Sequence, residues 1–159
     1  HFPASISIRR IILSSYSTFN DILVNLFNDI MDIESKAVIT EEFKDITNND
    51  MHVINAIGLG EGRNMTSVAN DLSVTVGTLT IAVNNLVKKA YVRRSRSEKD
   101  RRVVLISLTE KGRKAYDHHR RFHEEMIHAT LKGLSEEESK ILVKALTNLC
   151  DFFRSYQKK

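Results

Sequence analysis

The strongest concentration of charge in the sequence lies between Lys88 and Arg102. This segment has eight basic residues and two acidic ones, so it carries a net charge of +6. The whole chain carries +4, which leaves the other 144 residues at −2. A basic stripe on a nearly neutral protein is typical of a surface that binds a polyanion. The basic residues are Lys88, Lys89, Arg93, Arg94, Arg96, Lys99, Arg101 and Arg102.

Histidine is the other residue type whose spacing indicates chemistry. His119 and His123 lie four residues apart in a segment with a helical pattern, where two such side chains share a face and can bind one metal ion. A zinc protease needs Glu directly after the first histidine, and this sequence has Arg120 there. No Ser-His-Asp order, phosphate-binding glycine loop or carboxylate pair stands out. We therefore predict no enzyme and no cofactor, and His119 and His123 are either metal ligands or ordinary surface or inter-helix histidines.

The segment from Val76 to Lys89 is predicted to be a helix that reads bases. Its apolar residues recur at spacings of three and four (Val76, Leu79, Val83, Leu86 and Ala90), which gives a narrow inward seam. The opposite face is small and polar at its start, as a helix that enters a major groove requires. An asparagine there can pair with adenine, a threonine can bond a base or a phosphate, and an isoleucine can meet a thymine methyl group. The residues expected on this face are Gly77, Thr78, Thr80, Ile81, Asn84, Asn85 and Lys88.

The basic segment itself is predicted to be a β-hairpin with a charged tip. Residues 91–94 and 102–108 are rich in β-branched residues and flank the polar loop 95–101. Arginine is favoured in a narrow minor groove because the potential there is strongly negative. We expect Asp100 to hold Arg102 by an ion pair rather than to face DNA. A solvated charge run is the alternative, and the helix pair that precedes the hairpin favours the DNA-binding interpretation.

Several helices must position these two elements. A long amphipathic helix is expected first, with a break between Glu34 and Lys44. Thr47 caps a helix to about Ile57, and either Asn64 or Thr66 caps a short one to Leu72. A turn at Ser73-Val74 then joins that helix to the helix capped by Thr75, which makes a helix-turn-helix. After the hairpin, a helix runs from Thr109 to about Lys132, and a capping box of Ser135 and Glu138 opens the last helix, to about Tyr156.

Composition bounds the class of protein. The 159 residues suffice for one compact domain, and 42% apolar with 28% charged residues is typical of a globular protein. No apolar run approaches the roughly 20 residues that span a bilayer. Cys150 is the only cysteine, which suits a reducing compartment, so we expect a cytoplasmic protein with Cys150 as a buried thiol. The chain opens at His1 without a methionine, and its first residues are left out of the argument on the fold.

Residues 65–113 resemble the MarR family of winged helix-turn-helix regulators. An Asp-x-Arg hairpin tip followed by a Leu-Thr-x-x-Gly helix start is typical of that family, although Asn64–Ser67 lacks the proline often found there. Short stretches further resemble its subgroup of fatty-acid-biosynthesis repressors, the FabT type. The stretches that carry the family resemblance are 65–72, 76–80, 84–92, 100–102 and 108–112; those that carry the subgroup resemblance are 74–80, 96–104, 121–123 and 146–149.

The resemblance implies a homodimer whose first and last helices interlock and which binds a palindromic DNA operator. It also implies acyl-acyl carrier protein as a co-repressor. The apolar stripe of the last helix is too wide for one contact and independently favours a dimer. The basic face of residues 111–121 could receive an acidic carrier protein or could be an ordinary solvated face.

The prediction is therefore a mainly α fold with a small β-hairpin wing: dimerisation helices in 1–45, a winged helix-turn-helix in 46–108 and dimerisation helices in 109–159, in one intertwined domain. Its function is dimeric, sequence-specific transcriptional repression, and the alternative is a zinc-sensing or small-molecule-responsive regulator of the same fold. The predicted DNA-binding residues are Thr66, Ser67, Thr75, Gly77, Thr78, Thr80, Ile81, Asn84, Asn85, Lys88, Arg94, Arg96, Lys99, Asp100, Arg101 and Arg102.

Overall fold

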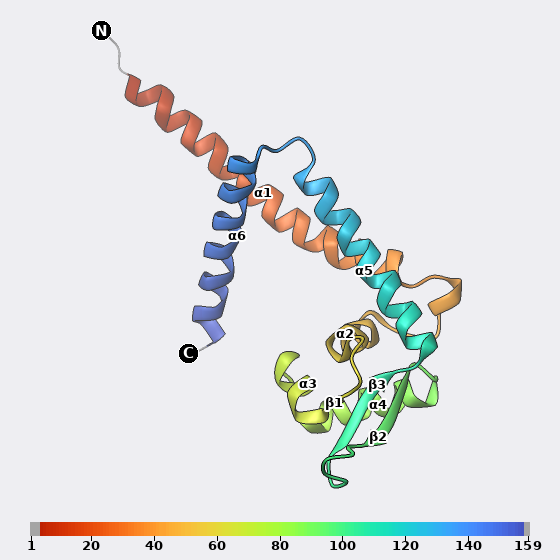
Figure 1. The fold of residues 1–159 in the computed structure, drawn as a ribbon. Helices are drawn as coiled ribbons and strands as arrows, with labels where there is room; N and C mark the ends of the chain where they lie inside the picture. Colours follow the sequence, from red (N-terminus) through yellow and green to blue (C-terminus); the bar gives the residue numbers. More distant parts are fainter. Residues whose placement is uncertain (1–3, 158–159) are drawn as a thin grey trace. The chain divides into compact units, whose positions relative to one another are not determined.

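The computed structural model describes residues 4–157, except for the side chains of residues 4–14, 31, 35, 38 and 157. The chain forms two compact units, the first ending at Phe122 and the second beginning at His123. The first contains most of the secondary structure (Figure 1): α1 (Ala4–Val38), the short 3-10 helix η1 (Glu41–Phe43), α2 (Asn48–Ile57), β1 (Arg63–Asn64), α3 (Met65–Asp71), α4 (Val76–Lys88), β2 (Val92–Arg96) and β3 (Val104–Leu108). Helix α5 (Glu110–Leu131) begins in the first unit and ends in the second, which also holds α6 (Glu136–Gln157). This is the predicted mainly α architecture with a small wing.

Helix α1 is long, and most of its described side chains are exposed. The expected break lies where predicted, because the helix ends at Val38 and η1 follows. Apolar side chains stay exposed along α1, including Phe19 at 57%, Phe27 at 69% and Ile33 at 54%. A helix whose apolar face is exposed to this extent has a surface suited to packing against another protein surface.

The core of the first unit is built from α2, α3, α4 and the sheet. Thr47 and Asp50 form a reciprocal capping box that starts α2, so that Met51 and Ile54 are directed into the core and fully buried. The seam of α4 is buried as predicted at Leu79, Val83 and Leu86. Val76, which was expected to continue this seam, is instead 43% exposed, because the seam reaches the core only from Leu79 onward.

The sheet has three antiparallel strands in the order β1-β3-β2. Strands β2 and β3 form the predicted hairpin, with Arg94 opposite Ile106, and β1 adds Arg63 opposite Ile106 on the other edge of β3. The sequence prediction missed β1. Two residues are too few for an alternating pattern, and Asn64 leaves the strand at once to cap α3 through a hydrogen bond from the Ser67 amide to Oδ1.

The last two helices start and stop as the sequence predicts. Thr109 Oγ1 accepts a hydrogen bond from the Gly112 amide, and Ser135 and Glu138 bond reciprocally at the start of α6.

The sequence prediction was wrong about Cys150. Its side chain is exposed, because the apolar stripe on which it lies is uncovered in the single chain. None of the helices in residues 4–157 is both long and apolar enough to cross a membrane.

Candidate nucleic-acid interface

The helix-turn-helix consists of α3, the turn 72–75 and α4. The turn is closed by a backbone hydrogen bond from Val74 N to Ala69 O, and Ser73 adopts the left-handed conformation with φ 54°. Thr75 then caps α4, its Oγ1 accepting from the Thr78 amide. Of the two candidate caps for α3, the structure uses Asn64. Local bonds thereby define the tight turn between the two helices.

The outer face of α4 is open. Ile81 is 66% exposed, and Thr78, Asn84, Asn85 and Lys88 are exposed as well. Thr80 differs from these residues, because it is half-buried and its hydroxyl donates to Val76 O at 2.7 Å. A base or phosphate would therefore have to compete with an internal hydrogen bond for the Thr80 proton.

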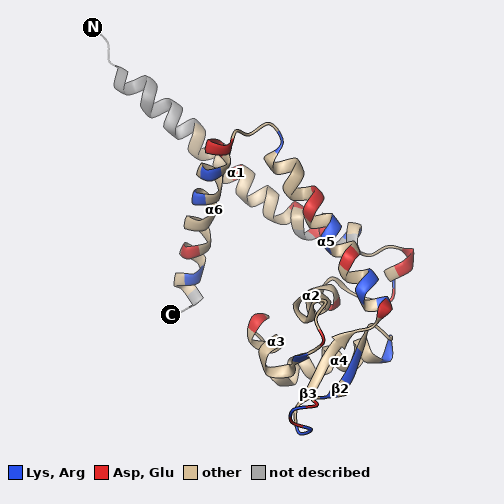
Figure 2. Ribbon diagram, viewed as in Figure 1, with Lys and Arg blue, Asp and Glu red and all other residues tan. Residues whose placement is uncertain are grey.

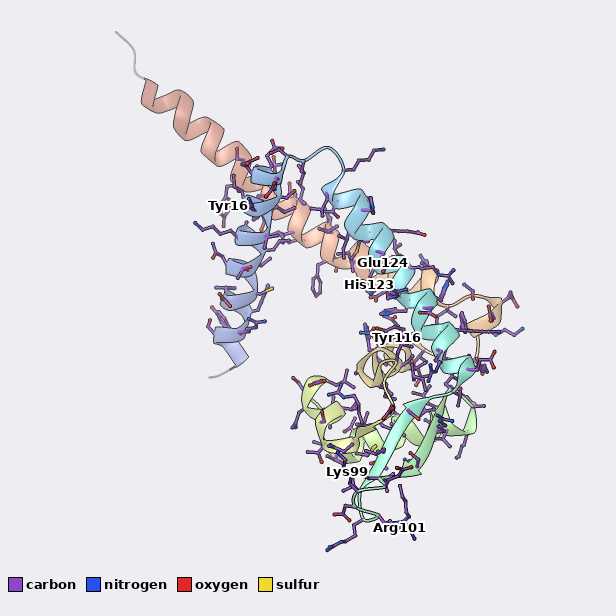
Figure 3. All side chains as sticks on the ribbon, viewed as in Figure 1. Tyr16, Lys99, Arg101, Tyr116, His123 and Glu124 are labelled. Atoms are coloured by element: carbon purple, nitrogen blue, oxygen red, sulfur yellow. The ribbon has the colours of Figure 1, made fainter. Side chains whose placement is uncertain are left out.

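The wing (residues 92–108) carries the basic stripe into a loop that joins β2 and β3. Figure 2 shows Lys and Arg along β2 and in this loop, and Figure 3 shows Lys99 and Arg101 there. Oδ1 of Asp100 accepts from the Arg102 amide at 3.0 Å and lies 3.5 Å from Arg102 Nε. Across the loop, Arg96 donates to Arg101 O at 2.7 Å. The ion pair expected between Asp100 and Arg102 is thus present, on side chains 51% and 94% exposed.

All of the predicted DNA-binding residues belong to the first unit. Most are exposed. Ser67 and Thr80 are half-buried, and Ser67 Oγ accepts a hydrogen bond of 2.6 Å from Arg63. Their contacts with DNA remain predictions. The exposed residues are Thr66, Thr75, Gly77, Thr78, Ile81, Asn84, Asn85, Lys88, Arg94, Arg96, Lys99, Asp100, Arg101 and Arg102.

Arg63 is a supporting residue that the sequence prediction missed. Its guanidinium donates to Ala56 O at 2.6 Å and to Ser67 Oγ at 2.6 Å, and lies 2.7 Å from Oδ2 of Asp71. It therefore ties the end of α2 to both ends of α3. A lone arginine after a glycine-rich loop carries no sequence signal for this role, because its partners come from two helices.

The histidines of α5, which include the possible ligands His119 and His123, lie in different environments. His119 is buried, with its Nε2 3.0 Å from Oε1 of Glu34 on α1. His118 is half-buried, within 3.2 Å of Ala37 O, and its ring lies 5.3 Å from that of Phe43. His123 is half-buried and His128 is exposed. The buried histidine therefore has a carboxylate partner within the first unit.

Known proteins share this arrangement over most of the chain. FabT of Streptococcus pneumoniae, solved in complex with DNA, is 41% identical with a TM-score of 0.79, and the similarity covers 89% of this chain and 99% of that one. MepR of Staphylococcus aureus, also solved with DNA, is 27% identical with a TM-score of 0.63 over 80% of this chain and 94% of that one. The HTH-type transcriptional regulator PchR of Bacillus subtilis is 26% identical over 127 residues, which are 77% of this chain and 75% of that protein.

The family assignment follows from residues 35–119, which match the family described as transcriptional regulator SarA/Rot and make up more than half of the chain. This region spans η1, the helix-turn-helix, the wing and the first half of α5. The relatives are transcriptional regulators and not enzymes. The chain is therefore a DNA-binding transcriptional regulator that belongs to the SarA/Rot family and has the winged helix-turn-helix fold of the MarR-type regulators.

Proposed function

We propose that the protein is a dimeric repressor that binds a palindromic operator at fatty-acid biosynthesis genes and uses acyl-acyl carrier protein as its co-repressor. One observation carries the sequence-specific part of this proposal. The exposed polar face of α4 and the exposed cations of the wing belong to one unit and follow each other directly in the chain. Base contacts by α4 would select the operator, and phosphate or minor-groove contacts by the wing would supply affinity.

Dimerisation is supported by the apolar surfaces that the single chain leaves uncovered. Helix α1 exposes Phe19 and Phe27, and α6 separately exposes Ile141, Leu146 and Phe153. Exposed patches of this kind are typical of subunit interfaces. We propose on this ground that the dimerisation helices lie in 1–45 and 109–159, around the DNA-binding region. Because the protein acts on DNA, we place it in the cytoplasm.

The co-repressor proposal depends on the resemblance to FabT-type repressors and on a surface hollow of the first unit. The hollow is about 740 Å³ and is lined by three exposed cations, Lys114, Arg120 and Arg121, and by two carboxylates, Glu42 and Asp117. Phe43 and His118 also line it. Cations around a partly apolar hollow match an acidic protein that presents an acyl chain.

Genome-wide footprinting in the source organism, followed by titration of the purified protein with the recovered duplex, tests the proposal. We expect sites upstream of fatty-acid synthesis genes and an affinity that falls steeply between low and high salt. Acyl-acyl carrier protein should tighten binding, whereas the carrier protein without an acyl chain should not. Sites upstream of unrelated genes would remove the fatty-acid assignment, and equal affinity at low and high salt would contradict the phosphate contacts.

Metal sensing is the alternative favoured by the buried Glu34–His119 pair, because Glu and His are side chains that ligate zinc. His123, one turn further along α5, has the same imidazole side chain as His119. Metal analysis of the purified protein and of His119→Gln distinguishes the two proposals. Stoichiometric zinc that is lost in the variant, together with zinc-dependent operator binding, would favour the metal sensor.

A further inference from the structure

The turn that joins α4 to the wing determines how the two DNA-reading elements are oriented. It is short: α4 ends at Lys88, Ala90 adopts the left-handed conformation with φ 64°, and β2 begins at Val92. A backbone hydrogen bond from Tyr91 N to Leu86 O closes it at 2.9 Å. A small rotation in this turn would change the angle between α4 and the wing, and the two would then no longer fit one duplex together.

Tyr91 anchors this turn from within. Its side chain is fully buried, and its hydroxyl donates to Oδ1 of Asp45 at 2.6 Å. The ammonium of Lys111 donates to the other carboxylate oxygen at 3.0 Å and lies 4.1 Å from the centre of the Tyr91 ring. Lys111 also donates to Lys89 O, inside the turn, at 3.2 Å. We call Asp45, Tyr91 and Lys111 the Tyr91 clamp.

The Tyr91 clamp joins three parts of the chain that are distant in sequence. Asp45 lies between η1 and α2, Tyr91 directly follows α4, and Lys111 lies in the first turn of α5. Thr109 also stabilises the α4-to-wing turn, because its hydroxyl donates to Ala90 O at 2.6 Å and to Tyr91 O at 3.1 Å. A phenylalanine would fill the space of the ring equally well. The hydroxyl of Tyr91 and the charges of Asp45 and Lys111 therefore contribute hydrogen bonds in addition to packing.

We propose that the Tyr91 clamp is a positioning device for DNA recognition, which holds the α4-to-wing turn in the one geometry that lets both elements meet an operator. This proposal depends on the sequence-specific DNA binding proposed above. Hydrogen bonds to a charged group are directional and strong, and a satisfied polar network favours one geometry over near alternatives. Non-specific binding requires no such geometry, because cations on α4 and on the wing can each meet phosphates independently.

Tyr91→Phe tests this directly, since it removes one oxygen and keeps the ring under Lys111. The wild-type protein is first used to select a preferred duplex from a random library, so the test does not depend on which genes are regulated. Affinities for that duplex and for a scrambled one are then measured across a range of salt concentrations. We expect Tyr91→Phe to reduce the ratio of the two affinities by about tenfold. The salt dependence should not change, because the same cations meet phosphate.

Tyr116→Phe is the matched control. Tyr116 is half-buried against the same core (its position on α5 is labelled in Figure 3), and within the described part of the chain its hydroxyl makes no hydrogen bond. It should keep the wild-type ratio of affinities. Asp45→Asn, at a side chain that is 42% exposed, provides a second variant that should fold. Its loss of selectivity should add only in part to that of Tyr91→Phe, because both variants weaken the same network of Asp45, Tyr91 and Lys111.

The outcomes separate the two proposals. A wild-type chain that selects no sequence overturns both of them. A wild-type preference that Tyr91→Phe retains, even with a lower melting temperature, overturns the clamp alone. Equal losses in Tyr91→Phe and Tyr116→Phe also overturn it, because the effect would then belong to the core in general.

Discussion

The imidazole of His119 lies against the carboxylate of Glu34, with Nε2 of the histidine 3.0 Å from Oε1 of the glutamate. Both side chains are almost completely buried, at 3% and 5% exposure, and they join α5 to α1 within the first unit. The rings of His52 and His119 lie perpendicular to each other, at a centroid separation of 5.8 Å. Because these groups are shielded from water, the loss of one partner leaves the other without solvent to replace it.

Glu34→Ala should therefore destabilise the protein strongly. We expect its free energy of unfolding to fall by about 1–3 kcal/mol, the usual result of removing one partner of a buried hydrogen bond. Urea denaturation followed by circular dichroism measures this. Lys36→Ala is the control, since its bond to Asp32 joins side chains that are 74% and 64% exposed. It should cost at most about 1 kcal/mol, and equal losses in the two variants would contradict this account of the pair.

Gly112→Ala should be destabilising for a backbone reason. A methyl group at Gly112 would overlap the carbonyl oxygen of Tyr91, which is backbone and cannot rotate away. We expect a loss of about 1–3 kcal/mol in thermal or urea unfolding, the range for overpacking. Gly60→Ala is the control, because nothing lies within 4 Å of its added carbon. A Gly112→Ala protein as stable as Gly60→Ala would show that the start of α5 can move away from the α4-to-wing turn.

Asn84→Ala and Lys99→Ala should weaken DNA binding in different ways. Asn84 is exposed on α4, so its loss should cost about 1–3 kcal/mol on the preferred duplex and relax selectivity at one base pair. Lys99 is exposed in the wing loop, so its loss should weaken binding to all sequences and reduce the salt slope by about 1. Fluorescence anisotropy on duplexes that differ at single positions separates the two. An Asn84→Ala variant with unchanged base preference would remove Asn84 from the base-reading residues.

For the two acidic residues of the wing loop, we can predict whether the loss of the charge weakens or strengthens operator binding. Asp100→Ala removes a negative charge from the interface, yet we expect weaker operator binding, because Arg102 loses the carboxylate that orients its amide and guanidinium. Glu98→Ala removes the same charge from an exposed residue of that loop and should slightly strengthen binding. Tighter binding by both variants would mean that Asp100 acts only through its charge. Arg102→Ala should cost about 1–3 kcal/mol.

The Tyr91 clamp predicts how stability depends on pH. The hydrogen bond from Tyr91, aided by Lys111 and opposed by partial burial, holds the pKa of Asp45 below its ordinary value of 3.8. A carboxyl with a lowered pKa stabilises the fold above its unfolded pKa, and this contribution is lost as the pH falls through the folded value. Burial, and then the hydrogen bond to Asp45, raise the pKa of Tyr91 far above its ordinary value of 10.0, and Glu42 and Asp50 act in the same direction. That contribution is present below pH 10 and is lost as the pH rises further.

Tyr91→Phe should therefore have a flatter profile of unfolding free energy against pH. The difference between wild type and variant should shrink as the pH falls below about 4, where Asp45 of the unfolded chain takes up a proton before that of the folded chain, and again above about pH 10. Urea denaturation at a series of pH values measures it, with Tyr116→Phe expected to follow the wild type. A constant difference across the whole range would contradict the linkage between Tyr91 and Asp45.

Local patterns in the sequence were sufficient for the elements that depend on local physics. The caps at Thr47, Thr75 and Ser135 are bonds between neighbouring residues, and the buried seam of α4 follows from the period of a helix. The hairpin and its Asp100–Arg102 pair are local in the same sense. The helix-turn-helix and the wing were therefore largely predictable, because each is formed within one short stretch of chain.

Tertiary structure alone decided the features that join distant segments. Strand β1, the Glu34–His119 pair and the Tyr91 clamp each depend on residues that no local period relates, the clamp spanning 46 residues from Asp45 to Tyr91. The exposure of Val76 and Cys150 was likewise a tertiary outcome, since a helical stripe indicates which residues share a face and not what covers it. The sequence by itself thus determined which helix and hairpin face outward. Folding decided how the turn between them is held, because the groups that hold it come from other parts of the chain.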